Sequence, residues 1–408
     1  MAFLLLPYFT NVLSKSDMGL INLYSSAMIF LIPFISMGVL QSVNTEFFKL
    51  DKKNFRDLFS TSLLLPLGVF LLSLLAFWLF RDLLITQYKF PELFIWLIPV
   101  VTFLSFISQH VMNLIRNEER PNLFMAVVLG RLFIEIALAV LLISLAGWAW
   151  QGRITGIAVS YVIFGLYAFW YFNKKQYLFG QIKKEIIKDE LLFSVPIILM
   201  QFSTFCMNYS DSFFLSRFTS DNNAEVGVYS IACIFASIII TLSSALLQYV
   251  HPKIFKLLSE PVINYAAIRK HFLLYIGVMT GGLLLLLVFV PLAYLWVINK
   301  EYRSGMQYYY LLCIGYYLWT IAYLFFSFLL YYKQKRTIIT LSLCFIAISL
   351  TGNYIFISRM AAWGGAISVC LSYTIVLILT LWITRKQMGF LFRPVNNGET
   401  MNTSLKDR

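Results

Sequence analysis

An arginine and a glutamate stand four residues apart inside a long apolar segment, at Arg131 and Glu135. Residues with this spacing share one face of an α-helix, so the two side chains can form an ion pair. Charged groups inside an apolar segment are costly and commonly functional. A guanidinium group matches the oxygens of a phosphate, so Arg131 could bind an anion, with Glu135 as its resting partner or as a proton site. The alternative is a purely structural ion pair buried between helices.

A carboxylate at Asp211 lies in a second apolar segment, among amide and hydroxyl side chains. Such a group can bind a cation or a proton and couple it to a conformational change. It can equally brace the end of its helix by pairing with Arg217. Amide side chains in the same half of the chain are polar enough to line a hydrated cavity. The candidate ligand-binding residues are Arg131, Glu135, Asn208 and Gln248, and the candidate ion-coupling residues are Asp211 and Glu135.

The chain lacks the sequence motifs of soluble enzymes. It has no glycine-rich phosphate loop, no HExxH and no GxSxG, and its three histidines are far apart in the sequence. The five cysteines all fall inside apolar segments, without the close pairs that bind metal or form disulfides. We therefore expect no metal, no cofactor and no catalytic activity. Clustered tyrosines could stack on sugars, or could serve as interfacial anchors and in helix packing.

The segments that carry these residues are long enough to cross a membrane. Hydrophobic residues make up 60% of the chain, charged residues 12%, and the mean hydropathy is +0.78, which excludes a soluble domain. About twelve apolar stretches suit transmembrane helices of roughly 20 residues each, which predicts an all-α polytopic membrane protein. The stretches are 1–13, 18–43, 60–80, 91–115, 122–146, 153–172, 191–217, 226–250, 271–298, 305–332, 337–357 and 363–384. For the first stretch, either the start codon is misplaced, or upstream residues are missing, or the helix is short.

Basic residues alternate between the connections of these segments. Every second connection is rich in Lys and Arg; these connections carry 23 of the 32 basic residues, the others carry 8, and only Arg131 remains. Short loops rich in Lys and Arg stay in the cytoplasm, so both termini are predicted to be cytoplasmic. The net charge of +13 therefore orients the helices and contacts anionic membrane lipids, and we expect no nucleic-acid partner.

The chain divides into two halves of six segments. We expect a first lobe at 1–172, a basic amphipathic cytoplasmic helix at 173–190, with a solvated linker as the alternative, a second lobe at 191–384 and a polar cytoplasmic tail at 385–408. Asp17-Met18-Gly19 is similar to Glu225-Val226-Gly227 at an offset of 208 residues, and the run from Gly152 is similar to the run from Gly364 at an offset of 212. Because each repeat has an even number of segments, a pseudo-two-fold axis along the membrane normal should relate the lobes around a central cavity.

Several short motifs follow one another in the order of a known family. They are Leu6-Pro7-Tyr8-Phe9-Thr10-Asn11-Val12-Leu13-Ser14, Phe193-Ser194-Val195-Pro196, Ser210-Asp211-Ser212-Phe213-Phe214-Leu215, Val226-Gly227-Val228-Tyr229-Ser230, Asn299-Lys300-Glu301-Tyr302 and Gly364-Gly365-Ala366-Ile367. Over essentially its whole length the chain resembles the bacterial oligosaccharide flippases, the polysaccharide-biosynthesis branch of the multidrug/oligosaccharidyl-lipid/polysaccharide exporter superfamily. The family usually has arginine directly after the aspartate, where this chain has Ser212, so the resemblance carries no charge role to that position.

The resemblance implies a multi-pass protein of the bacterial cytoplasmic (inner) membrane. It would move undecaprenyl-diphosphate-linked oligosaccharide repeat units between leaflets by alternating access of two lobes, for O-antigen, capsule or exopolysaccharide assembly. Its partners would be the lipid-linked oligosaccharide, membrane lipids and a polysaccharide polymerase, and the anionic diphosphate suits Arg131. Two alternatives are a cation-coupled multidrug antiporter of the same superfamily and a membrane-embedded polysaccharide polymerase or glycosyltransferase. The short outer connections leave little room for the catalytic loop of such an enzyme.

Overall fold

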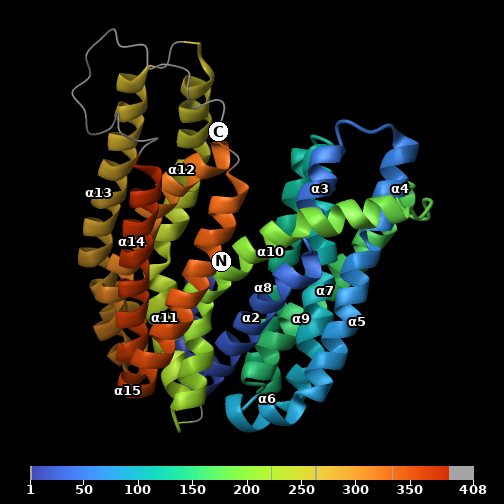
Figure 1. Cartoon of the computed structure of the whole chain (residues 1–408). Coiled ribbons are helices and arrows are strands. Elements are labelled where there is room, and N and C mark those ends of the chain that lie inside the picture. Colours follow the sequence, from blue (N-terminus) through green and yellow to red (C-terminus); the bar gives the residue numbers. More distant parts are fainter. Residues whose placement is uncertain (1, 222, 262–263, 333, 386–408) are drawn as a thin grey trace.

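The computed structural model describes residues 2–221, 223–261, 264–332 and 334–385. This part of the chain contains α-helices and one 3-10 helix and no strand, and its helices form two lobes (Figure 1). The first lobe consists of α1 (Ala2–Val12), α2 (Lys15–Ser36), α3 (Val39–Glu46), α4 (Lys52–Ser62), α5 (Leu64–Leu79), α6 (Arg81–Tyr88), α7 (Glu92–Asn117), α8 (Pro121–Ala146) and α9 (Trp150–Lys174). The second consists of α10 (Lys184–Phe218), α11 (Ala224–Ala236), α12 (Ile238–Ser259), α13 (Tyr265–Val297), the 3-10 helix Lys300–Gly305, α14 (Met306–Tyr331) and α15 (Lys335–Thr384).

Nine helical stretches in the described part of the chain are long and apolar enough to cross a membrane, or ten if α10 is counted across its bend. Two features explain why this number is lower than the twelve spans that were predicted. α15 contains two of the predicted spans, which meet at Ala361, where φ is +49° and the backbone leaves the helical conformation. α1 has 11 residues and is shorter than a membrane span. The prediction of an all-α polytopic membrane protein with two lobes is confirmed.

The two lobes lie closer together at the end that holds α6 than at the end that holds α4 (Figure 1). We call these the α6 end and the α4 end. Near the α6 end, α2 crosses α11 so closely that a Cβ on Gly19 would overlap the carbonyl oxygen of Asn223, and a Cβ on Gly227 would overlap that of Lys15. Because only glycine lets two backbones approach this closely, the crossing depends on these two residues.

The predicted span 18–43 is interrupted within the first lobe. α2 ends at Ser36 and α3 begins at Val39, because Met37 and Gly38 have φ values of +44° and +68°. A left-handed backbone of this kind ends a helix, and glycine adopts it without strain. A Cβ on Gly38 would lie 2.9 Å from the side chain of Ile197 on α10. The interruption therefore makes room for the helix that leads into the second lobe.

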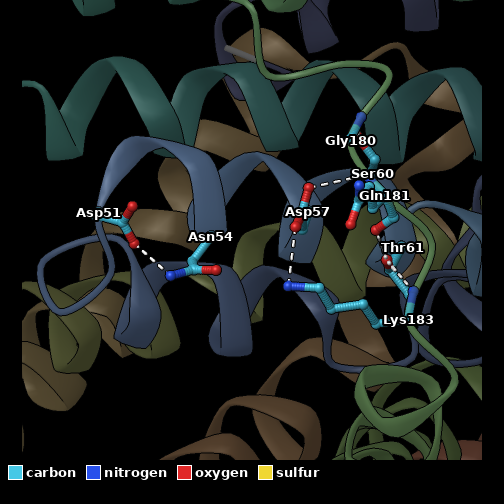
Figure 2. Close-up of polar contacts among 8 residues, drawn as sticks. All are labelled: Asp51, Asn54, Asp57, Ser60, Thr61, Gly180, Gln181 and Lys183. Carbon is cyan, nitrogen blue, oxygen red and sulfur yellow. Dashed lines mark hydrogen bonds and ion pairs between the residues drawn. The ribbon is translucent and has the colours of Figure 1, made fainter.

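The segment between the lobes, residues 175–183, is called the strap below. It is not helical, so the predicted amphipathic helix is wrong there, and helix resumes only at Lys184. Side chains of α4 bind the strap backbone instead: Asp57 accepts a 2.8 Å hydrogen bond from the amide of Gln181, and Ser60 accepts one of 2.8 Å from the amide of Gly180 (Figure 2). Lys183 forms a 2.9 Å ion pair with Asp57. Because α4 satisfies these backbone groups, the strap needs no helix and is fastened to the first lobe.

A second anchor holds the beginning of the strap. Glu118, between α7 and α8, forms a 2.7 Å ion pair with Lys175 and accepts hydrogen bonds from the hydroxyl groups of Tyr171 and Tyr177. Burial raises the pKa of Glu118, but the hydrogen bonds and the charge of Lys175 outweigh burial and hold this pKa below its usual value. The carboxylate is therefore charged at neutral pH, and the anchor is intact there.

Candidate anion-binding site in the first lobe

Arg131 and Glu135 form an ion pair on α8. Nη1 of Arg131 is 3.0 Å from Oε2 of Glu135, and both side chains are largely buried. The guanidinium carbon of Arg131 lies 4.8 Å from the centre of the Tyr161 ring on α9. A cation over an aromatic face is stabilised by the charge distribution of the ring. The guanidinium group is therefore held in place by contacts with two helices.

A second arginine reaches the same carboxylate from α9. Nη2 of Arg153 lies 2.7 Å from Oε1 of Glu135, so each carboxylate oxygen faces a different guanidinium group. Sequence reasoning placed Arg153 in a connection and missed this contact. α8 ends at Ala146, and the next residue, Gly147, has a φ of +68° that turns the chain back toward α9. Two helices joined by a short turn lie side by side. The short connection between the predicted spans 122–146 and 153–172 could therefore have suggested that Arg153 lies close to Glu135.

Small residues bring the two helices of this hairpin together. A Cβ on Gly156 would lie 2.7 Å from the carbonyl oxygen of Glu135, and a Cβ on Gly152 would lie 2.8 Å from the side chain of Ile143. The absence of side chains at these positions lets α9 lie directly against α8. The close packing fixes where Arg153 stands relative to Glu135.

The charged groups line a cavity of about 400 Å³ inside the first lobe. Its wall is built from α1, α2, α7, α8 and α9, and Ser25 and Ser105 add hydroxyl groups to it. Nε of Arg131 and Nη1 of Arg153 are buried and have no hydrogen-bond partner among the described residues. Buried donors without partners are costly, and here two arginines face one glutamate. An anion with several oxygens would satisfy both donors and balance the excess positive charge.

Asp211 belongs to a separate polar cluster in the second lobe. Its side chain is 3% exposed and accepts hydrogen bonds from the hydroxyl group of Tyr229, at 2.9 Å, and from the amide of Ser212, at 2.8 Å. Within the described residues Asp211 forms no ion pair. The alternative of a brace to Arg217 is wrong, because the guanidinium group of Arg217 lies over the ring of Phe218. Asp211 is thus a buried carboxylate bound by neutral donors.

The remaining candidates also lie in the second lobe. Asn208 on α10 accepts a 2.7 Å hydrogen bond from the hydroxyl group of Tyr373, and Gln248 is exposed on α12. Neither residue is part of the cavity wall around Arg131, which comes from helices of the first lobe. The structure therefore brings Arg131 and Glu135 together, adds Arg153, and places Asn208 and Gln248 elsewhere.

These features define a membrane transporter with two lobes and a cavity. The structure is similar to the inward-facing conformation of a multidrug resistance MATE family transporter of the MOP superfamily, with a TM-score of 0.72 and 15% identity over 96% of this chain and 94% of the other. An outward-facing conformation of such a transporter matches with a TM-score of 0.57 and 17% identity, over 96% and 92% of the two chains. A MOP superfamily transporter from Pyrococcus furiosus Vc1 (DSM3638), described as having a binding pocket of reverse polarity, matches with a TM-score of 0.59 and 16% identity over 96% and 92%.

The sequence gives the family within this class. Residues 1–258, more than half of the chain, match the family described as polysaccharide biosynthesis protein. The chain belongs to this family, as its resemblance to polysaccharide exporters predicted. A comparison with curated proteins gives no match.

Proposed function

We propose that this transporter carries undecaprenyl-diphosphate-linked oligosaccharide repeat units across the bacterial cytoplasmic membrane by alternating access, for O-antigen, capsule or exopolysaccharide assembly. The observation that carries the proposal is the pair of arginines in the first-lobe cavity, with buried N–H groups that have no partner among the described residues. A diphosphate offers several anionic oxygens to such donors. No bond is made or broken in this process.

The charge of the cavity separates this proposal from its nearest alternative. A cation-coupled multidrug antiporter would need a carboxylate free to meet a cationic substrate, whereas Glu135 is bound on both oxygens by Arg131 and Arg153. The cavity wall therefore has an excess of positive charge and favours anions. The family of polysaccharide biosynthesis proteins supports the same conclusion. A membrane-embedded polymerase or glycosyltransferase has no comparable support from this cavity.

The orientation in the membrane follows from the basic connections. The described residues of these connections lie at the α4 end (Figure 1). We therefore propose that this end and both termini are cytoplasmic. The lobes are further apart there, which is the arrangement of an inward-facing transporter (Figure 1). The higher TM-score with an inward-facing transporter than with an outward-facing one supports this assignment. The proposed lobes are residues 1–172 and 191–384, joined by 173–190, and the proposed cytoplasmic tail, 385–408, lies outside the described residues except for Arg385.

Further roles are proposed for the second lobe. Asp211 is the candidate for ion coupling, because a buried carboxylate with only neutral donors can take up a cation or a proton. Glu135 is the second candidate. Asn208 and Gln248 would contact the sugar once the lobes come together around it. Membrane lipids surround the protein, and a polysaccharide polymerase is the proposed recipient of the transported units.

The test removes the guanidinium group of Arg131. In a bacterial host that depends on this gene, Arg131→Ala should abolish surface polysaccharide and accumulate lipid-linked repeat units on the inner leaflet, with normal amounts of protein in the membrane. Arg116→Ala is the matched control, because Arg116 is exposed at the end of α7 and does not line the cavity. Normal surface polysaccharide in the Arg131 variant would exclude Arg131 from transport.

A further inference from the structure

A second cavity, of about 500 Å³, lies at the α4 end, away from Arg131. It is lined by residues of α3, α4, the connection between them, the strap and the first turns of α10. The strap forms part of its wall because Asp57 and Thr61 of α4 hold residues 181–183 in place (Figure 2). The cavity is therefore a product of the same contacts that fasten the strap to the first lobe.

Carboxylates dominate the charge of this cavity. Its lining includes Glu46, Asp189 and Glu190, against one basic residue, Lys183. The ammonium group of Lys183 is already paired with Asp57 at 2.9 Å, and Glu46 is paired with Lys49 at 2.9 Å. Asp189 and Glu190 form no ion pair among the described residues, so they supply the unbalanced negative charge of the wall. In a chain with a net charge of +13, this is a local concentration of negative charge. A cation is the ligand that such a wall favours.

Glu190, in the wall of this cavity, has one carboxylate oxygen that lacks a hydrogen-bond donor among the described residues. The residue is 3% exposed, and its Oε1 accepts hydrogen bonds from Ser42, at 2.5 Å, and from Ser62, at 3.2 Å. Its Oε2 is buried and has no hydrogen-bond partner among the described residues. A buried carboxylate oxygen without a donor is costly, so a ligand that donates a hydrogen bond to Oε2 would be stabilised there.

The lining also indicates which cation fits. Within the described residues no group of three or more His, Cys, Asp or Glu side chains is arranged to hold a metal ion. Leu50, Leu58 and Ile186 supply apolar surface beside the carboxylates. A charged head with hydrogen-bond donors and a short aliphatic chain matches both parts of this wall.

We propose that this cavity binds a primary alkylammonium group, whose N–H groups bond to Oε2 of Glu190 and whose charge is balanced by Glu190 and Asp189. Two sources share this chemistry: a soluble diamine or polyamine, and the ethanolamine headgroup of a phospholipid. Because the ligand would contact α3, α4 and α10 together, its binding stabilises the attachment of the strap and of the first turns of α10 to the first lobe.

The experiment measures thermal unfolding of the full chain in lipid nanodiscs. In phosphatidylcholine nanodiscs, putrescine should raise the unfolding midpoint of the wild type with a saturable dose response, and magnesium chloride at the same ionic strength should not. Replacing part of the lipid with phosphatidylethanolamine tests the headgroup. Stabilisation by putrescine alone identifies a soluble amine, and stabilisation by phosphatidylethanolamine alone identifies the headgroup.

Glu190→Gln is the decisive variant. Glutamine has the same shape and can still accept from Ser42 and Ser62, but it removes the charge, so the amine should bind more weakly by about tenfold or more. Glu185→Gln is the matched control, since Glu185 is exposed on the same helix and does not line the cavity. Three results would overturn the proposal. They are equal amine binding by wild type and Glu190→Gln, equal stabilisation by magnesium, and no stabilisation by either amine source.

Discussion

At the level of single residues, the first-lobe site has one glutamate held between two arginines. Sequence spacing was enough to predict the pair of Arg131 and Glu135, because positions four apart share a helix face. Arg153 could not be placed in the same way, because its contact with Glu135 depends on how tightly the hairpin closes at Gly147. The predicted spans 122–146 and 153–172 indicate a hairpin, but the hydropathy pattern does not show how closely its two helices pack.

Asp211 shows the opposite limit of sequence reasoning. Its neighbour Arg217 suggested an ion pair, but the structure gives the carboxylate hydrogen bonds from Tyr229 and from the amide of Ser212. Tyr229 lies on the next helix, and only the packing of α10 against α11 makes it a partner. Long-range partners of a buried carboxylate therefore had to come from the structure.

We expect Asp211→Asn to uncouple transport from its driving ion. Asparagine can accept the same hydrogen bond from Tyr229 but removes the charge that would bind a proton or a cation. Transport of lipid-linked oligosaccharide into proteoliposomes should no longer respond to an imposed proton or sodium gradient. In the wild type, the gradient should stimulate transport by about 5- to 150-fold, the usual size of coupling between two sites. Asp82→Asn is the control, because Asp82 is exposed on α6. An unchanged gradient response would exclude Asp211 from coupling.

At the level of elements, the helices and the break near Ala361 were predictable, but the interruption of the predicted span 18–43 was not. Long apolar runs predicted the spans, including the separate stretches 337–357 and 363–384 that meet at Ala361. Met37 and Ala361 have positive φ values although neither is glycine, so their residue types gave no sign of this backbone conformation. The non-helical strap was missed for a related reason. Ile182, Ile186 and Ile187 have helical spacing, but only the last two lie in α10, because α4 binds the backbone of the strap.

Gly180→Ala should loosen the strap. A Cβ at this position would lie 2.5 Å from the carbonyl oxygen of Arg56, so the strap would have to move away from α4, at a cost of about 1–3 kcal/mol. Limited trypsin digestion followed by mass spectrometry should show faster cleavage after Lys183 and Lys184. Gly68→Ala is the control, because a Cβ there would meet nothing within 4 Å. Equal cleavage rates in both variants would show that the strap is not held by this contact.

At the level of the whole molecule, the two lobes are the structural counterpart of the sequence repeat. The offset of 208 residues relates Gly19 to Gly227, and these two glycines lie at the crossing of α2 and α11 near the α6 end. The proposed alternating access would require this crossing to separate when the opposite end closes. The glycines therefore belong to the part of the protein where the lobes meet in the described conformation.

Gly227→Leu should prevent the lobes from meeting at the α6 end. A side chain there would overlap the backbone of Lys15, so the distance between spin labels on α2 and α11 should increase. Transport should fall by about tenfold or more, because overpacking at this crossing disfavours one of the two required conformations. Gly281→Leu, on α13, is the control, since a Cβ there would meet nothing within 4 Å. Wild-type distances and transport in Gly227→Leu would show that the crossing is not a gate.

The contacts at this crossing are reciprocal. Gly19 meets Asn223 and Gly227 meets Lys15, and Asn223 stands 208 residues after Lys15, just as Gly227 stands after Gly19. Reciprocal contacts of this kind are the signature of a two-fold symmetric homodimer. A half-length ancestor with the same surface would have paired with its own copy, and gene fusion would have preserved that pairing. The joined chain could then change each half independently, leaving Arg131 and Arg153 in the first half and Asp211 in the second.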